Sequence, residues 1–128
     1  MKITSLVARI LLGALFVFAG TNHLFNFFGK QPLPPGPAGA YLGAMVATGY
    51  MNVIGVCEVL AGFLLLINRF LALALVVLAA LIFNILVVNL LMAPKALPVA
   101  LFIVVLWVLA AYGARPALLP LLRAKVAE

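Results

Sequence analysis

The chain has 128 residues, of which 69% are hydrophobic and only 8% are charged, and its formal net charge is +6. So few polar side chains cannot cover the surface of a water-soluble domain, which excludes that class and predicts a membrane protein. The basic residues stand at the ends of apolar segments rather than on one face, so we expect them to meet lipid head groups and not nucleic acid. The single cysteine, Cys57, excludes an intrachain disulfide and a thiol-bound metal cluster.

Four apolar runs are long enough to cross a bilayer, because ~20 helical residues span its hydrocarbon core. We expect these spans at about residues 3–28, 51–67, 70–92 and 97–112, in one domain that uses residues 1–128. The very short turn between the second and third spans predicts a hairpin. The predicted fold is therefore an all-α, antiparallel transmembrane four-helix bundle.

Small, polar and aromatic residues of the first span share one helical stripe, which we expect to face the other helices. The stripe consists of Arg9, Gly13, Phe16, Gly20, His23 and Phe27. Arg9 is either an anchor that reaches back to the interface or a buried partner of Glu58, and the sequence favours neither. His23, near the far interface, is interpreted as a hydrogen-bonded helix-end residue in preference to a ligand, and it cannot hold a metal alone.

The segment that follows contains four prolines, at 32, 34, 35 and 37, which predict an extended connection. Residues 38–48 then form a predicted short helix that ends at Gly49. Tyr41 and Tyr50 suit the membrane interface, so we place this helix there. It would form a lid over an opening between the first two spans.

Glu58 is the only acidic residue inside an apolar run. A carboxyl group in hydrocarbon must face the bundle interior, pair with a cation or keep its proton. Gly55 and Gly62 lie three residues before and four after it, beside it on the helix, where they let another helix approach closely. Glu58 is therefore the best candidate for a site.

The third span contains Asn84 and Asn89, whose amides need partners inside the bundle. The fourth has Pro98 near its start, where proline suits the first helical turn, and is otherwise a packing or lipid-facing helix. Residues 113–128 carry basic and leucine side chains and are expected to form a cytoplasmic tail on the membrane surface.

Rough heights along the helices place the polar residues of the spans on one interior seam. They are Arg9, His23, Glu58, Asn84 and Asn89. We expect this seam to line a narrow cavity for a small lipophilic ligand, with Glu58 as the hydrogen-bonding or proton-exchanging group. The alternative is a protonated Glu58 that only fixes helix register. No catalytic constellation, metal cluster or phosphate loop is present in the sequence, so we do not expect an enzyme on its own.

Orientation follows from the basic residues. Lys2, Arg9, Arg69, Arg115, Arg123 and Lys125 fall on one side of the predicted membrane, and Lys30 and Lys95 on the other. The positive-inside rule then places both termini in the cytoplasm.

Four stretches resemble the DoxX-like family of small four-helix membrane proteins: ARILLGALFVFAGTNH, YLGAMVATGYM, EVLAGFLLLINR and NILVVNLL. The resemblance covers nearly the whole chain. The matching positions are Arg9, Gly20, His23, Glu58, Gly62 and Arg69. His23 stands where many members have lysine, and Asn89 where relatives often have histidine.

This resemblance implies a multi-pass protein of the bacterial inner membrane and two hypotheses of function. In the first, the seam binds a quinone-like or other lipophilic molecule, with the chain as the membrane subunit of an oxidoreductase or redox-stress complex. In the second, the chain is a non-enzymatic scaffold or assembly chaperone that binds a protein partner. A homodimer that buries the featureless fourth span is compatible with both.

Overall fold

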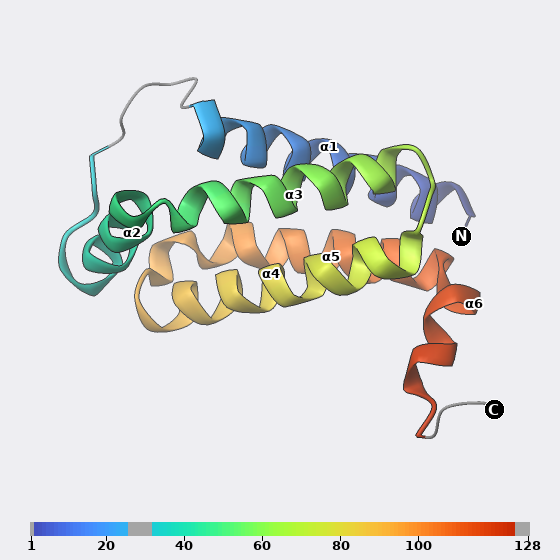
Figure 1. The fold of residues 1–128 in the computed structure, drawn as a ribbon. Helices are drawn as coiled ribbons and strands as arrows, with labels where there is room; N and C mark the ends of the chain where they lie inside the picture. Colours follow the sequence, from blue (N-terminus) through green and yellow to red (C-terminus); the bar gives the residue numbers. More distant parts are fainter. Residues whose placement is uncertain (1, 26–31, 125–128) are drawn as a thin grey trace.

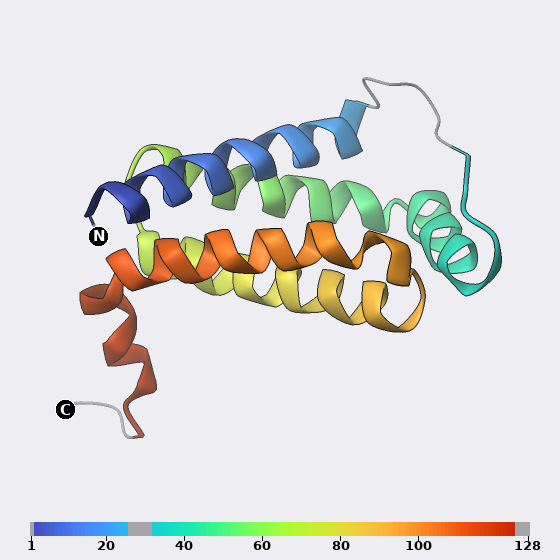
Figure 2. The same ribbon diagram turned by 180° about the vertical axis from the view of Figure 1, so that it is seen from behind.

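The computed structural model describes residues 2–25 and 32–124, and these form helices and turns without a strand. The predicted all-α class is confirmed for this part of the chain. Four long helices lie side by side (Figures 1 and 2). They are α1 (Lys2–Phe25), α3 (Tyr50–Leu66), α4 (Leu71–Leu91) and α5 (Leu97–Gly113).

Shorter elements occupy the two ends of this group. Helix α2 (Gly36–Thr48) lies at one end, where the 3₁₀ turn η1 (Pro94–Ala96) also joins α4 to α5. Helix α6 (Arg115–Leu118) and the turn η2 (Leu119–Leu122) leave the other end, near the start of α1 (Figure 1). The two ends of the molecule are therefore different in structure.

The predicted spans agree with the long helices to within about two residues, apart from the end of the first. Residues 26–28 of that predicted span lie outside the described residues. Pro98 stands in the first turn of α5, as predicted, where its missing N–H costs no hydrogen bond. Phe70 and Met92 flank α4 as its caps instead of extending it.

The predicted short helix is present, but it starts earlier than expected. Helix α2 begins at Gly36, and Pro37 lies in its first turn, so the prediction that all four prolines exclude helix was wrong for Pro37. Gly49 ends the helix in the left-handed conformation with φ of 79°, and its N–H bonds to the Val46 carbonyl. The chain then turns sharply, and α2 meets α3 at 85°.

Three helical stretches are long and apolar enough to cross a membrane by themselves: Ile3–Phe25, Leu71–Leu91 and Pro94–Gly113. The bent pair α2 and α3 supplies a fourth if it is counted as one span. Helix α3 alone has 17 residues, at the short end of what a bilayer requires. The described residues are therefore compatible with a multi-pass membrane protein.

Helix α1 packs against α3 and α5, and α4 packs against the same two helices. Helices α1 and α3 pack the most closely, because glycines face each other across their contact. Gly13 lies against the backbone of Gly62, and Gly20 against that of Gly55. The higher residue number on α1 pairs with the lower residue number on α3, so these two helices run in opposite directions. Without a Cβ at these positions, the backbones approach to van der Waals contact.

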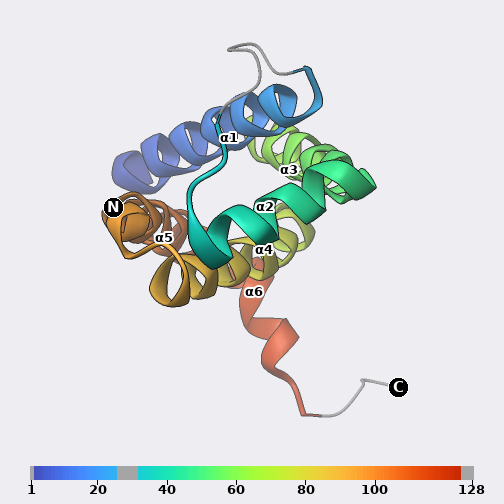
Figure 3. The same ribbon diagram turned by 90° about the vertical axis from the view of Figure 1, so that its left-hand side faces the viewer.

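Large side chains fill only one half of the helix group. The fully buried ones are Leu12, Phe16, Leu65, Leu75 and Leu78. Leu12, Leu75 and Leu78 belong to the half that contains the N-terminus, and Phe16, near the middle of α1, also borders the cavity described next. In the other half, the inward residues after Phe16 on α1 and after Ile82 on α4 border a cavity. Helix α2 crosses that end of the molecule (Figure 3).

Candidate functional site

The cavity has a volume of about 770 Å³ and is bordered by parts of α1, α2, α3, α4 and α5. Most of its lining is apolar, including Leu15, Phe16, Met45, Met51 and Ile54. Its polar lining consists of His23, Tyr41, Glu58, Asn84, Asn89 and Lys95. Four of the five residues predicted for the seam therefore border one space.

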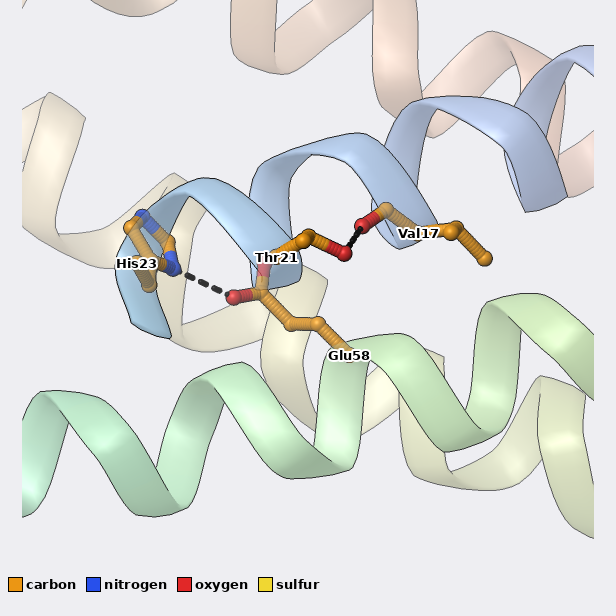
Figure 4. Close-up of polar contacts among 4 residues, drawn as sticks. All are labelled: Val17, Thr21, His23 and Glu58. Atoms are coloured by element: carbon orange, nitrogen blue, oxygen red, sulfur yellow. Dashed lines mark hydrogen bonds and ion pairs between the residues drawn. The ribbon is translucent and has the colours of Figure 1, made fainter. Parts of the chain in front are cut away.

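Glu58 is the most buried polar residue on this lining, with 3% of its surface exposed. The expectation that it faces the interior is confirmed. Its Oε1 lies 2.7 Å from Nδ1 of His23, which is half-buried (Figure 4). The contact needs one proton, donated either by Nδ1–H to the carboxylate or by a protonated carboxyl group to a bare Nδ1. The predicted role of His23 as a hydrogen-bonded residue near the helix end is confirmed, and its partner is Glu58.

The α1–α3 glycine contact explains why these two side chains meet. His23 lies three residues after Gly20, and Glu58 lies three residues after Gly55. Because the helices run in opposite directions, these residues start on opposite sides of the contact, each about 4.5 Å from it along the axis. Helical side chains lean toward the N-terminus of their own helix, so both lean back toward the glycines and toward each other.

The neighbouring Thr21 on α1 bonds within its own helix and not to the Glu58 carboxyl group. The Thr21 hydroxyl donates to the Val17 carbonyl of its own helix over 2.6 Å (Figure 4). The Oε1 atom of Glu58 is the oxygen that contacts His23. Glu58 also lines the cavity, so its carboxyl group lies beside the space that a guest molecule would occupy.

The two asparagines of α4 find partners at the rim of the cavity and not deep in the helix group. Asn84 Nδ2 donates to the Tyr41 hydroxyl over 3.2 Å, and Asn84 itself is exposed. Asn89 Nδ2 lies 3.5 Å from the carbonyl of Ala96, a weak contact within the α4–η1–α5 connection. The expected hydrogen bond between helices is present for Asn84, whose partner lies on α2, whereas the partner of Asn89 is in the connecting turn.

Helix α2 contributes more to the site than its sequence indicated. Its inward side chains Ala38, Tyr41 and Met45 line the cavity, together with Pro34 and Pro35 before it. Tyr41 was predicted only as an interfacial residue, yet its hydroxyl joins α2 to α4. The spacing of Ala38, Tyr41 and Met45, three and four residues apart, was the available signal for an inward helix face.

Arg9 does not belong to this site. Its guanidinium donates to the Leu65 carbonyl at the end of α3, and it lines a separate cavity at the opposite end of the helix group. The buried pair of Arg9 with Glu58 is therefore excluded, because His23 occupies that role. The predicted five-member seam was wrong in this respect and comprises four residues.

The arrangement can hold an apolar molecule and hydrogen-bond one polar group of it. The Glu58–His23 contact provides an acceptor or an exchangeable proton beside an aliphatic and thioether wall. No group of three or more potential metal ligands occurs among the described residues. No protein-family model, curated protein or solved structure matches the chain.

Proposed function

We propose that this chain is a DoxX-like integral membrane protein whose cavity binds a small lipophilic molecule of the quinone type. The observation that carries the proposal is the buried Glu58–His23 contact beside a cavity of about 770 Å³. Pockets of this size, mostly apolar with a few convergent polar groups, are typical of small-molecule sites. An ionisable pair at this depth in an apolar helix group is costly, and such residues generally serve a site.

In this proposal, α1, α3, α4 and α5 cross the bacterial inner membrane as an antiparallel bundle. The support is their outward surface, where large apolar side chains such as Phe63, Phe83 and Val99 are exposed. Such a surface suits lipid and would be unfavourable in water. Helix α2 then lies at the outer interface and covers the cavity.

The ends of the molecule fit the proposed orientation. The α3–α4 turn with Arg69, the start of α6 with Arg115 and the start of α1 share one end (Figure 1). Lys95 lies at the other end, within η1. The excess of basic residues on the first end supports cytoplasmic termini.

Within the cavity, a ring carbonyl or hydroxyl of the ligand would lie against Glu58. The second carboxyl oxygen, Oε2, would accept a hydrogen bond from a hydroxyl or, when protonated, donate one to a carbonyl. His23 holds the carboxyl group in place through Oε1. The apolar part of the ligand would contact Leu15, Met45 and Ile54. As the membrane subunit of an oxidoreductase, the chain would hold the ligand while a partner protein supplied the electrons.

The proposal is tested with a short-chain ubiquinone analogue added to the purified chain in mild detergent. A ligand at a hundred times its dissociation constant stabilises the folded state by about 2.7 kcal/mol, which a thermal unfolding scan detects. Glu58→Gln keeps the shape of the side chain and a bond to His23 but loses the acid. We expect this variant to bind the analogue about tenfold more weakly, which corresponds to the loss of one hydrogen bond with an ionisable group.

Two matched variants on α1 test whether the ligand occupies this cavity. Ala19→Leu places a larger side chain in the cavity lining and is expected to abolish the stabilisation by the analogue. Ala14→Leu makes the same change on the exposed side of the helix and should leave it intact. If the analogue stabilised Ala19→Leu, Ala14→Leu and Glu58→Gln to the same extent, the proposed site would be refuted.

A further inference from the structure

A second cavity of about 190 Å³ lies at the other end of the helix group, where α1, α5 and the α3–α4 turn meet. Its polar lining consists of Ser5, Arg9 and Asn68. Its remaining lining is apolar or glycine, with Leu6 and Leu71 as the largest side chains. It shares no lining residue with the larger cavity, so its chemistry is separate.

The charge of Arg9 has no counter-charge in this part of the chain. Its half-buried guanidinium has five N–H donors, and the hydrogen bond described for it goes to the Leu65 carbonyl. The sequence contains two acidic residues. Glu58 is held by His23, and Glu128 lies outside the described residues. A neutral carbonyl satisfies one donor of Arg9 but does not neutralise its charge.

The Ser5 hydroxyl on the same cavity is also unsatisfied. Ser5 is 7% exposed, and its Oγ has no hydrogen-bond partner among the described residues. Its Cβ packs closely on Gly113, where a larger residue would not fit. A buried hydroxyl without a partner is unfavourable, so a group in the cavity that bonds to it would stabilise this end of the molecule.

We propose that this cavity binds the phosphate group of an anionic phospholipid. A phosphate accepts hydrogen bonds only, so it matches the free donors of Arg9, the Ser5 hydroxyl and the Asn68 amide. The planar guanidinium suits two phosphate oxygens at once. The acyl chains would follow Leu6 and Leu71 toward the apolar surface of α1 and α4.

The surroundings favour a lipid over a free ion as the source of the phosphate. Arg69, Arg115 and Arg123 lie in the segments at this end of the molecule, and all three are exposed. Exposed basic residues beside apolar helices concentrate anionic lipids at a membrane surface. Inorganic phosphate offers the same oxygens but cannot use the apolar part of the lining.

The test measures lipid binding by the full-length chain in neutral detergent with native mass spectrometry. The probes are a phosphatidylglycerol and the diacylglycerol with the same acyl chains, which lacks only the phosphoglycerol head group. We expect the wild-type chain to retain phosphatidylglycerol at least tenfold better than diacylglycerol. Inorganic phosphate at millimolar concentration should not displace the lipid.

Variants separate the specific site from general attraction by charge. Ser5→Ala removes only the unpaired Oγ, so it should fold as well as the wild type and bind phosphatidylglycerol about tenfold more weakly. Arg9→Gln should weaken binding further. Arg123→Gln removes one charge at the same end, away from the cavity lining, and should change binding by less than twofold.

Three outcomes would overturn the inference. One is equal retention of the two lipids by the wild type. Another is that Ser5→Ala and Arg123→Gln bind phosphatidylglycerol with equal affinity. This comparison tests the site even if Arg9→Gln fails to fold. Displacement of the lipid by inorganic phosphate would support the anion site and overturn its assignment to a lipid.

Discussion

The α1–α3 contact is closest at Gly20, and we therefore expect Gly20→Ala to disrupt both the fold and the larger site. A Cβ added to Gly20 would lie 2.5 Å from the Gly55 carbonyl oxygen and 2.9 Å from the Val59 nitrogen. Both are backbone atoms of a helix and cannot rotate away. The added methyl group therefore forces α1 and α3 apart.

The size of the effect follows from these distances. Ordinary contact begins near 3.4 Å, so the helices must separate locally by about 1 Å. A gap of this size forfeits about a quarter to a half of the dispersion energy of the atoms that line it. Overpacking of this kind typically costs about 1–3 kcal/mol, and we expect about 2 kcal/mol here. The same shift would lengthen the 2.7 Å His23–Glu58 contact beyond hydrogen-bonding distance.

The assay is reversible unfolding in mixed micelles by titration with a denaturing detergent, followed by circular dichroism. Gly43→Ala is the matched control, because a Cβ there meets only the flexible Leu33 side chain at 3.2 Å. Alanine has the higher helix propensity, so the control should be neutral or more stable by up to ~1 kcal/mol. Gly20→Ala should also lose stabilisation by the ubiquinone analogue. Wild-type stability of Gly20→Ala would refute the close-contact reasoning.

Two further predictions concern the turns and the cover of the cavity. Phe70 has φ of 51° in the α3–α4 turn, so Phe70→Gly should relieve left-handed strain and raise the free energy of unfolding by about 1 kcal/mol in the same titration; a decrease would contradict this. Tyr41→Phe removes the bond to Asn84 and should speed hydrogen exchange of the α2 amides but not of the α4 amides. Unchanged exchange in α2 would show that this bond does not hold the helix.

The sequence carried enough information for the helices because their ends have chemical markers. Gly49 ends α2, and Pro98 lies in the first turn of α5, each for a backbone reason that acts within one turn. The start of α2 was missed because a proline in a first helical turn resembles a proline in an extended loop. Only the hydrogen-bond pattern of the following residues separates the two.

The site was harder to predict because heights along helix axes ignore the direction of side chains. By axial counting, His23 and Glu58 belong to different levels, whereas their opposite tilts bring them to 2.7 Å. Arg9 was misplaced for a related reason, since the nearest acceptor was the carbonyl of Leu65, which no side-chain pattern reveals. Tyr41 was missed because its partner lies on another helix.

The cavity itself follows from the distribution of volume along the helices, which periodicity does not report. Leu12 on α1 belongs to one buried cluster with Leu75 and Leu78 in the filled half, whereas the inward position Ala19 offers only a methyl group in the hollow half. Packing free energy is therefore concentrated in the half that contains the N-terminus. Side chains that line the cavity have few neighbours to lose, so variants there should change ligand affinity more than stability. The glycine contact at Gly20 is the exception, because it supports the hollow half directly and couples the two properties.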